Sequence, residues 1–313
     1  MTRQALALTA LLALAAPAAA QRADEAPFTI EQTGRGYAHL ADAVAAIGDR
    51  AGTIRIAPGT YDDCAVQEGG TIAYVAAEPG TAIFDGGICE DKATLVLRGK
   101  GARVDGLVFQ NLQVEDGNGA GIRIEQGDLE VANALFRNSE QGILSADDAK
   151  SSISVTRSTF SRLGRCDRDL DCAHSIYIGD YGSLTVTKSR FEKGNGGHYV
   201  KSRSRRTFVT DSTFDDTAGR ATNYMIDLPE GSTGAITGNL FIQGRDKENY
   251  SAFIAVAAED GEHSSAGLRI DDNVAAIAPG VTRSTIFIAN WGKDRLAIGD
   301  NRLGDGLTLY EKR

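Results

Sequence analysis

A six-residue pattern recurs along most of the chain, with an apolar residue at its first position and, in most copies, Phe at its last. Six copies end in Phe, and they occupy residues 104–109, 131–136, 155–160, 186–191, 209–214 and 236–241. Two further copies, 270–275 and 298–303, keep the apolar start and an Asn two positions before the end. The copies begin 23 to 34 residues apart, a spread that a solenoid of short strands accommodates by letting extra residues bulge out as loops.

A second apolar run precedes each copy from the second onward. These runs predict strands at 122–124, 143–145, 176–178, 199–201, 225–227, 253–256 and 286–288, stacked in one parallel sheet. Each repeat then forms one coil of a parallel β-helix, with neighbouring coils ~4.8 Å apart. The aromatic residues that end the copies are expected to form one column in the core, made of Phe136, Phe160, Phe191, Phe214 and Phe241.

The region before the repeats contains the one clear amphipathic helix, HLADAVAAIG (39–48), with Leu40, Val44 and Ile47 on one face. A solenoid needs such a cap over its open apolar end. The helix, the following TIRIAPGTY (53–61) and the Phe-ended coils together resemble the right-handed parallel β-helix, or pectin-lyase-like, superfamily. HYVKSR (198–203) followed by YMIDLP (224–229) is similar to a pairing in secreted bacterial β-helix proteins that have no assigned reaction.

This resemblance implies an all-β, right-handed parallel β-helix solenoid with a short N-terminal capping helix. It is less specific for activity, because the superfamily includes polysaccharide lyases, glycosidases, epimerases, esterases and non-catalytic adhesins. Relatives that cleave uronates often hold Ca²⁺. The acidic pairs of this chain, however, suit turns, so we expect no metal ion and no other cofactor.

The first 20 residues have the pattern of a secretory signal peptide, in which Arg3 precedes an Ala-rich apolar run that ends at Ala20. We therefore expect cleavage near Ala20 and a secreted or periplasmic protein. An N-terminal segment with the capping helix then covers 21–51, and the β-helix covers 52–313. No other segment approaches the ~18 apolar residues of a membrane span, and we expect a monomer.

Four cysteines in an exported chain suggest two disulfides. Three pairings are possible, and we favour Cys64 with Cys89 and Cys166 with Cys172 because these link neighbours. The loop between Cys166 and Cys172 carries alternating Asp residues, like part of a calcium loop. It lacks the Gly and Glu that such a loop requires, so it is expected to be a solvated loop held by its disulfide.

The chain carries a formal net charge of −9, which disfavours nucleic acid as a partner. One segment reverses that charge: residues 188–206 contain seven basic residues and a single acid, Glu192. Alternation along the strand predicts that Tyr199, Lys201, Arg203 and Arg205 point outward together. They form either a solvated cationic face paired with acids of neighbouring coils, or a groove for an anionic polysaccharide.

Neighbouring coils are expected to add groups to this face. Tyr177 lies one coil before Lys201 and Asp227 one coil after, so the three side chains are expected within ~10 Å of one another. Arg123 and Glu125 occupy the same outward positions two coils before Tyr177. We therefore expect Tyr177, Arg205, Arg123 and Glu125 to contribute to substrate binding.

β-Elimination of a uronate needs a group that neutralises the carboxylate, a base and an acid. Arg203 suits the carboxylate, and Lys201 can be the base if nearby arginines lower its pKa. Tyr199 or Tyr177 can protonate the leaving oxygen. His198 is a second candidate base, although its alternation predicts an inward, hydrogen-bonded side chain.

The leading interpretation is therefore a lyase that cleaves a polysaccharide containing uronic acid. A glycoside hydrolase remains an alternative, with Asp227 paired to Glu125 or Asp180. A uronate epimerase is another, since it uses much the same groups as a lyase. A non-catalytic carbohydrate-binding or surface protein is the third, and it predicts basic residues scattered along the whole solenoid.

Overall fold

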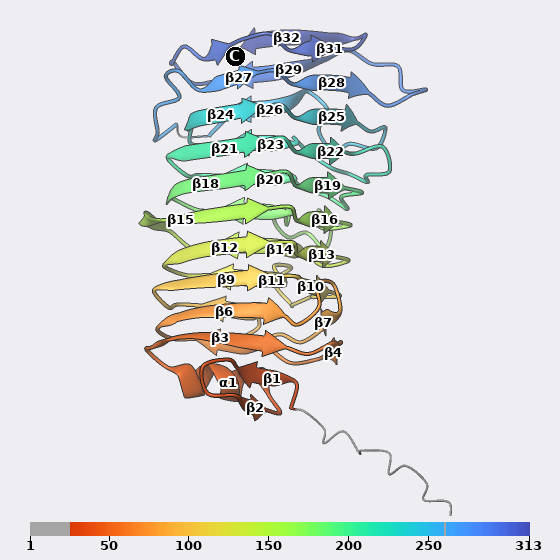
Figure 1. Cartoon of the computed structure of the whole chain (residues 1–313). Helices are drawn as coiled ribbons and strands as arrows, with labels where there is room; N and C mark the ends of the chain where they lie inside the picture. The colour runs from red at the N-terminus through yellow and green to blue at the C-terminus, as the bar shows by residue number, and fades with distance from the viewer. Residues whose placement is uncertain (1–25, 260) are drawn as a thin grey trace, which may run out of the picture.

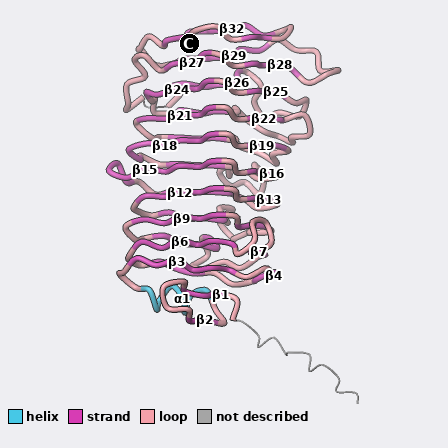
Figure 2. Tube along the Cα trace, viewed as in Figure 1, coloured by secondary structure: helices cyan, strands magenta, loops and turns pink. Residues whose placement is uncertain are grey.

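The computed structural model describes residues 26–259 and 261–313 and shows a parallel β-helix (Figure 1). The expected signal peptide, residues 1–20, lies outside the described residues. Within the described part, α1 (Leu40–Ile47) is the only helix, and it lies at the N-terminal end of a stack of strands and loops (Figure 2). No helix among the described residues is long and apolar enough to cross a membrane.

Each coil contributes one strand to each of three sheets, which run the length of the solenoid. The first sheet contains β2 (Arg35–Tyr37), β1 (Phe28–Ile30), β3 (Ala51–Ile56), β6 (Thr71–Ala76), β9 (Gly101–Asp105), β12 (Asp128–Ala132), β15 (Asp148–Thr156), β18 (Tyr181–Thr187), β21 (Arg206–Thr210), β24 (Thr233–Thr237), β27 (Arg269–Asp271) and β30 (Ala297–Ile298).

The second sheet contains β4 (Gly59–Tyr61), β7 (Ala82–Asp85), β10 (Leu107–Gln110), β13 (Leu135–Arg137), β16 (Thr159–Ser161), β19 (Arg190–Glu192), β22 (Thr213–Asp215), β25 (Leu240–Gln243), β28 (Val274–Ile277) and β31 (Arg302–Leu303). The third sheet contains β5 (Ala65–Gln67), β8 (Ala93–Leu97), β11 (Ala120–Ile124), β14 (Gln141–Ser145), β17 (Ile176–Ile178), β20 (Val200–Ser202), β23 (Ile226–Leu228), β26 (Ala252–Val256), β29 (Thr285–Asn290) and β32 (Leu307–Lys312). The seven predicted strands all fall in this third sheet, as expected.

The predicted aromatic column is confirmed. Backbone register places the five Phe residues named above directly over one another from β13 to β25. Their rings stack with centroids 4.8 to 4.9 Å apart, and Phe84 and Phe109 extend the stack toward the N-terminus. All of these rings are buried, so the regularly spaced Phe residues of the sequence are core residues of the solenoid.

A ladder of Ser and Asn side chains, buried in all but the last coil, marks the corner between the first and second sheets. In each coil the side-chain oxygen accepts a hydrogen bond from the backbone N–H at the equivalent position of the coil before it. The ladder runs through Ser158, Ser189, Ser212, Asn239, Asn273 and Asn301. These are the Ser and Asn positions of the repeated pattern, and they satisfy backbone donors that the corner would otherwise bury without partners.

The N-terminal end of the solenoid is covered as predicted. Leu40, Ala43, Val44 and Ile47 of α1 are buried against the first coil. Beside the helix, β1 pairs antiparallel with both β2 and β3, in contrast to the parallel pairs of the coils. Strands β1 and β2 were not predicted, because neither belongs to the repeated pattern.

Both predicted disulfides are present. Cys64 and Cys89 are joined with their Cα atoms 5.6 Å apart, and Cys166 and Cys172 with theirs 4.4 Å apart. No free cysteine is left among the four. The second disulfide closes the loop between β16 and β17, next to the strand face on which the site residues were predicted.

Replacement of Phe191 with Ala tests the aromatic column. This ring stacks at 4.8 Å on both neighbours, so its removal leaves a cavity that the rigid stack cannot fill. We expect the free energy of unfolding to fall by about 3–5 kcal/mol, measured by urea denaturation. Leu240→Ala is the control, because Leu240 points outward beside Phe241 and is 39% exposed. Equal losses in the two variants would contradict a core column.

Candidate functional site

The outer face of the third sheet presents one side chain per coil. The register pairs Leu144 with Tyr177, Tyr177 with Lys201, and Lys201 with Asp227. Tyr177, Lys201 and Asp227 therefore lie on successive strands, about 4.8 Å apart, as the sequence predicts. We call this row of outward side chains the outer column, and Ala255 continues it on β26. Its small side chain leaves room above Asp227 for larger groups from the loops.

Lys201 lies at the centre of a charged cluster. Its Nζ is 3.8 Å from Oδ2 of Asp227 and 3.0 Å from Oε1 of Glu259, and it lies 5.3 Å from the centre of the Tyr177 ring. Only 13% of the Lys201 side chain is exposed. The ammonium group is therefore held between two carboxylates over an aromatic face, an arrangement that stabilises its charge.

Arg203 is tied to the same cluster from the end of β20. Its Nε donates a hydrogen bond of 3.0 Å to the hydroxyl of Tyr177, and its other nitrogens pair with Glu230 and Glu259. Glu259 thus bridges Lys201 and Arg203. Although partial burial favours the protonated form, hydrogen bonds from these two cations hold the pKa of Glu259 below its usual value.

Asp227 is the most unusual acid of the cluster. Its side chain is 5% exposed, and burial raises its pKa from 3.8 to about 7, against the opposing effect of Lys201. Nε2 of His198 lies 3.4 Å from Oδ2 of Asp227, the same oxygen that Lys201 approaches. A carboxyl group with a pKa near 7 can both give and take up a proton at neutral pH.

His198 belongs to a stack of rings that runs beside the outer column. It lies 4.9 Å from His174 and 5.5 Å from Tyr224, ring centre to ring centre. Burial lowers the pKa of His174 to about 3 and that of His198 well below its usual value. Nδ1 of His174 accepts a hydrogen bond from the backbone N–H of His198. His198 is buried, as expected, but the bond to His174 comes from its backbone, and its ring contacts Asp227 of the outer column, so the expected inward side chain is not found.

The expected outward position of Tyr199 is wrong. Strand β20 begins at Val200, and Tyr199 lies at the corner that precedes it, where the chain turns and alternation does not hold. Its ring is 1% exposed and packs edge-on against Phe191 and Phe214 of the core column. Because the hydroxyl lies inside the molecule, Tyr199 cannot contact a ligand on the outer face.

The Tyr199 hydroxyl is part of a buried polar network instead. It donates to Asp216, which also accepts from Thr222 and forms an ion pair of 3.1 Å with Lys247. The side chains of Asp216 and Lys247 are 0% and 1% exposed. This network joins the loops of three successive coils and fixes the corner from which His198 and Tyr224 project.

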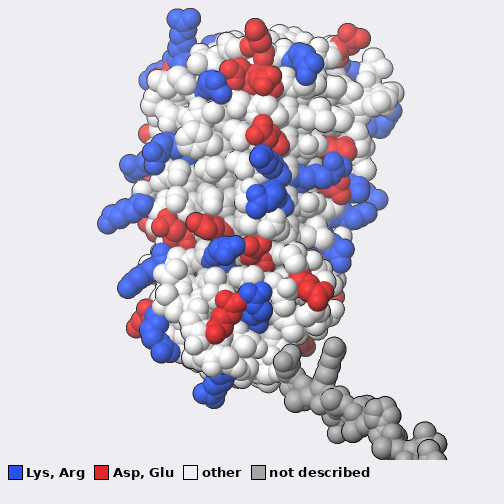
Figure 3. Space-filling model, viewed as in Figure 1, with Lys and Arg blue, Asp and Glu red and all other residues white. Residues whose placement is uncertain are grey.

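The basic side chains after Lys201 do not form the continuous row that was expected. Because β20 has only three residues, Arg203 and Arg205 lie beyond its end. Arg205 is more exposed and pairs with Asp180, which also contacts His263. Acidic and basic side chains are interspersed over the face of the solenoid shown in Figure 3. Lys201, Arg203 and Arg205 are each paired with acids of neighbouring coils.

Two other predicted substrate-binding residues lie apart from Lys201. Arg123 occupies the outer column two strands before Tyr177, as expected, but Leu144 separates them. Glu125 pairs with Lys92 and Arg98 in a separate cluster. The structure therefore does not bring Glu125 next to Asp227, which removes one of the two carboxylate pairs considered for a hydrolase.

Four residues that contact Lys201, Arg203 or His198 were not predicted to take part in the site. They are Glu230 and Glu259 of the charged cluster, and His174 and Tyr224 of the ring stack beside it. Tyr224 and the two glutamates lie in loops, where no periodicity of the sequence indicates direction. A cavity of about 330 Å³ opens beside Glu259 and is lined by His263, Trp291 and Asp294 among others. Among residues 26–259 and 261–313, no group of three or more His, Cys, Asp or Glu side chains is arranged to hold a metal ion.

Comparisons with known proteins agree with the fold. The family model described as "Right handed beta helix region" matches residues 95–291. Among solved structures, ORF18 of Geobacillus virus E2 is similar with a TM-score of 0.50 and 12% sequence identity. The match covers 87% of this chain and 57% of the viral chain, so this chain spans just over half the length of that protein. No curated protein matches the sequence.

The raised pKa of Asp227 predicts how stability changes with pH. The folded protein binds this proton more tightly than the unfolded chain, so stability falls as the pH rises from about 4 to about 7 and then levels off. Asp227→Asn mimics the protonated form at every pH. At pH 8 we expect this variant to exceed the wild type by up to about 4 kcal/mol in free energy of unfolding.

The difference between Asp227→Asn and the wild type should disappear near pH 4, where both side chains are uncharged. Urea denaturation at the two pH values measures it. Asp272→Asn replaces an exposed carboxylate far from the site and is expected to show no such pH-dependent gain. A gain from Asp227→Asn of the same size at both pH values would refute the assignment.

Proposed function

This chain belongs to the right-handed β-helix family, and from that premise we propose that it cleaves an anionic polysaccharide containing uronic acid by β-elimination. The fold supports a carbohydrate-related role. The observation that carries the finer proposal is the register of Tyr177, Lys201 and Asp227 on successive strands, with Arg203 bonded to Tyr177. These four side chains supply a cation for the carboxylate and groups that exchange protons.

Glu259 marks where the substrate carboxylate binds. Its carboxylate contacts Arg203, the cation that the uronate carboxylate needs, and Lys201, the proposed base. Glu259 is 40% exposed, whereas Glu230 and Asp227 are 8% and 5% exposed, so Glu259 is the partner that a ligand can most easily replace. A uronate that takes its place keeps a charge-assisted contact with Arg203 and brings its sugar ring next to Nζ of Lys201.

The proton transfers then involve Lys201 and Tyr177. Nζ of Lys201 takes the proton from C5 of the uronate, a double bond forms between C4 and C5, and the bond from C4 to the glycosidic oxygen breaks. The Tyr177 hydroxyl gives its proton to that oxygen. Because Arg203 donates a hydrogen bond to the Tyr177 oxygen, its charge stabilises the phenolate that remains.

Asp227 prepares Lys201 for this role. Lys201 must lose a proton before it can act as a base, and Asp227 lies 3.8 Å away with a pKa of about 7. In its ionised form, Asp227 is the neighbouring group that can take up the proton that Lys201 releases. His198, which burial keeps neutral, contacts the same oxygen of Asp227 as Lys201 and is a positioning residue in this proposal.

A glycoside hydrolase is the second candidate, and one observation favours it. Asp227 and Glu259 both reach the ammonium of Lys201, and the pKa of the first is raised while that of the second is lowered. One protonated and one ionised carboxyl group are what glycoside hydrolysis requires. The products separate the two reactions, because only elimination creates a conjugated double bond that absorbs ultraviolet light.

Export from the cytoplasm is part of the proposal. The N-terminal sequence has the pattern of a signal peptide. The two disulfides are consistent with an extracellular or periplasmic location, where such bonds persist. A polysaccharide is also a substrate that such a location makes accessible.

The catalytic assignment is tested on polygalacturonate, alginate and chondroitin sulfate, with unsaturated and reducing ends measured in parallel. Lys201→Ala is expected to lower kcat by ~10²–10⁴-fold, the range for a positioned base. Lys201→Arg should be as inactive, because it keeps the charge and cannot release its proton. Tyr177→Phe should lower kcat in the same range.

Arg206→Ala is the matched control, since Arg206 is an exposed cation on the neighbouring first sheet. It should leave kcat and KM unchanged. An active Lys201→Arg variant would remove Lys201 as the base. Reducing ends without unsaturation, abolished by Asp227→Asn, would establish the hydrolase instead. Wild-type protein inactive on all three polymers would count against elimination of these uronates.

Glu259→Gln tests the position of the substrate carboxylate. The substitution keeps the shape of the side chain and removes the charge that competes with an anionic ligand. We expect KM for the cleaved polymer to fall about two- to fivefold, in line with the small free energy of a partly exposed ion pair. Glu262→Gln, from the same loop, should have no effect. A KM that rises in Glu259→Gln would show that Glu259 assists binding.

A further inference from the structure

A polar groove of about 720 Å³ crosses the loops that lead from the second sheet to the third. It receives side chains from five successive coils, in the loops that follow β10, β13, β16, β19 and β22. The lining residues used below are Asn111, Asn138, Glu140, Arg162, Arg165 and Arg168. None of them belongs to the charged cluster around Lys201.

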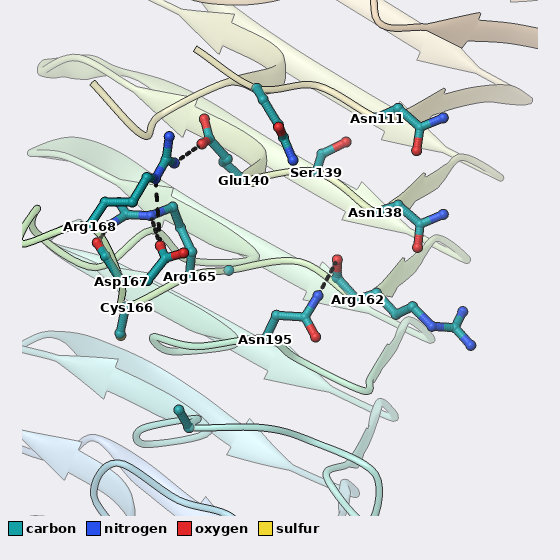
Figure 4. A pocket seen from close by; sticks show the side chains of 13 residues that line it. Asn111, Asn138, Ser139, Glu140, Arg162, Arg165, Cys166, Asp167, Arg168 and Asn195 are labelled. Atoms are coloured by element: carbon teal, nitrogen blue, oxygen red, sulfur yellow. Dashed lines mark hydrogen bonds and ion pairs between the residues drawn. The ribbon is translucent and has the colours of Figure 1, made fainter. Parts of the chain in front are cut away.

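One wall of the groove repeats with the coils. Asn111, Asn138 and Arg162 each follow the last residue of a second-sheet strand, and each has a positive φ of 52 to 59°. All three side chains are exposed and lie one above another in Figure 4, about 4.8 Å apart along the solenoid. Arg162 forms no ion pair with any described residue, so its charge is available to a ligand.

The opposite wall is fixed by buried charged groups. Glu140, 5% exposed, accepts hydrogen bonds from the backbone N–H groups of Val114 and Gly119 and pairs with Arg168. Arg165, 7% exposed, donates to Asp167 and to the backbone carbonyl of Asp171. These contacts and the Cys166–Cys172 disulfide hold the wall in place before a ligand arrives, which reduces the entropic cost of binding.

We propose that this groove binds a second stretch of the anionic polysaccharide, away from the bond that is cleaved. The identity of the polymer rests on the proposed function. The side-chain amides of Asn111 and Asn138, on two successive coils, can bond sugar hydroxyls along a chain, and the guanidinium of Arg162 matches a carboxylate. Nδ2 of Asn111 also donates to Oδ1 of Asp85, which fixes its orientation. A groove that follows the solenoid axis suits an extended polymer.

The groove and the catalytic cluster share one boundary. Cys166 lines the groove, and its Sγ accepts a hydrogen bond of 3.1 Å from the backbone N–H of Gly197, which directly precedes His198. The disulfide loop therefore separates the two sites. A long chain can reach both, whereas a short oligosaccharide bound at Lys201 cannot, so the groove should matter only for long substrates.

Arg162→Asn is the test variant, because Asn already occupies the same left-handed conformation at positions 111 and 138. Binding is measured by retardation in native gels that contain polygalacturonate, alginate or chondroitin sulfate. For the polymer that retards the wild type most, we expect Arg162→Asn to weaken binding about tenfold, and more salt to shrink the difference. Arg157→Asn, an exposed arginine with φ of 47° at the other corner of the same coil, should bind as the wild type does.

The failures of the two proposals differ. A wild type that is retarded but cleaves nothing would refute elimination and leave the groove standing, provided that Arg162→Asn binds more weakly. A wild type that cleaves the polymer, with the same KM in Arg162→Asn on long and short substrates, would refute the groove alone. No retardation of the wild type by any of the three polymers would also overturn the groove.

Discussion

Every coil of this protein must place its residues directly over those of the coil before it, because the backbone hydrogen bonds of all three sheets run between coils. That single constraint aligns the Phe rings at 4.8 Å spacing and makes the Ser and Asn side chains meet the backbone of the preceding coil. It also brings Tyr177, Lys201 and Asp227 together, although they are separated by more than twenty residues in sequence. The site is thus a consequence of the register.

The charges at the site are balanced within the protein before any ligand binds. Lys201 and Arg203 lie among Asp227, Glu230 and Glu259, and burial keeps the nearby histidines neutral. Burying charges without partners would cost several kcal/mol each, so Glu230 and Glu259 stabilise the two cations during folding. The three acids differ in exposure, and this difference makes Glu259 replaceable while Asp227 stays in place.

The sequence predicted those features that follow from repetition. The strands, the Phe column and the succession from Tyr177 to Asp227 depend only on the period and on alternation within strands. Tyr199 was misplaced because it lies at a corner, where two consecutive residues, Tyr199 and Val200, are both buried. Glu230 and Glu259 were missed because loops have no period that fixes the direction of a side chain. The groove was missed for the same reason.

The buried pair of Asp216 and Lys247 has a consequence for how the solenoid unfolds. In a chain of stacked repeats each coil contacts mainly its neighbours, so coils tend to fray one at a time from the ends. Asp216 accepts from Tyr199 of the preceding coil and pairs with Lys247 of the following one. If any one of these three coils unfolded, a charged group or a hydroxyl of the other two would remain in the interior without its partner. The middle of the solenoid should therefore unfold as one cooperative unit. The backbone amide hydrogens of β20 and β23 should then be among the slowest in the molecule to exchange with solvent.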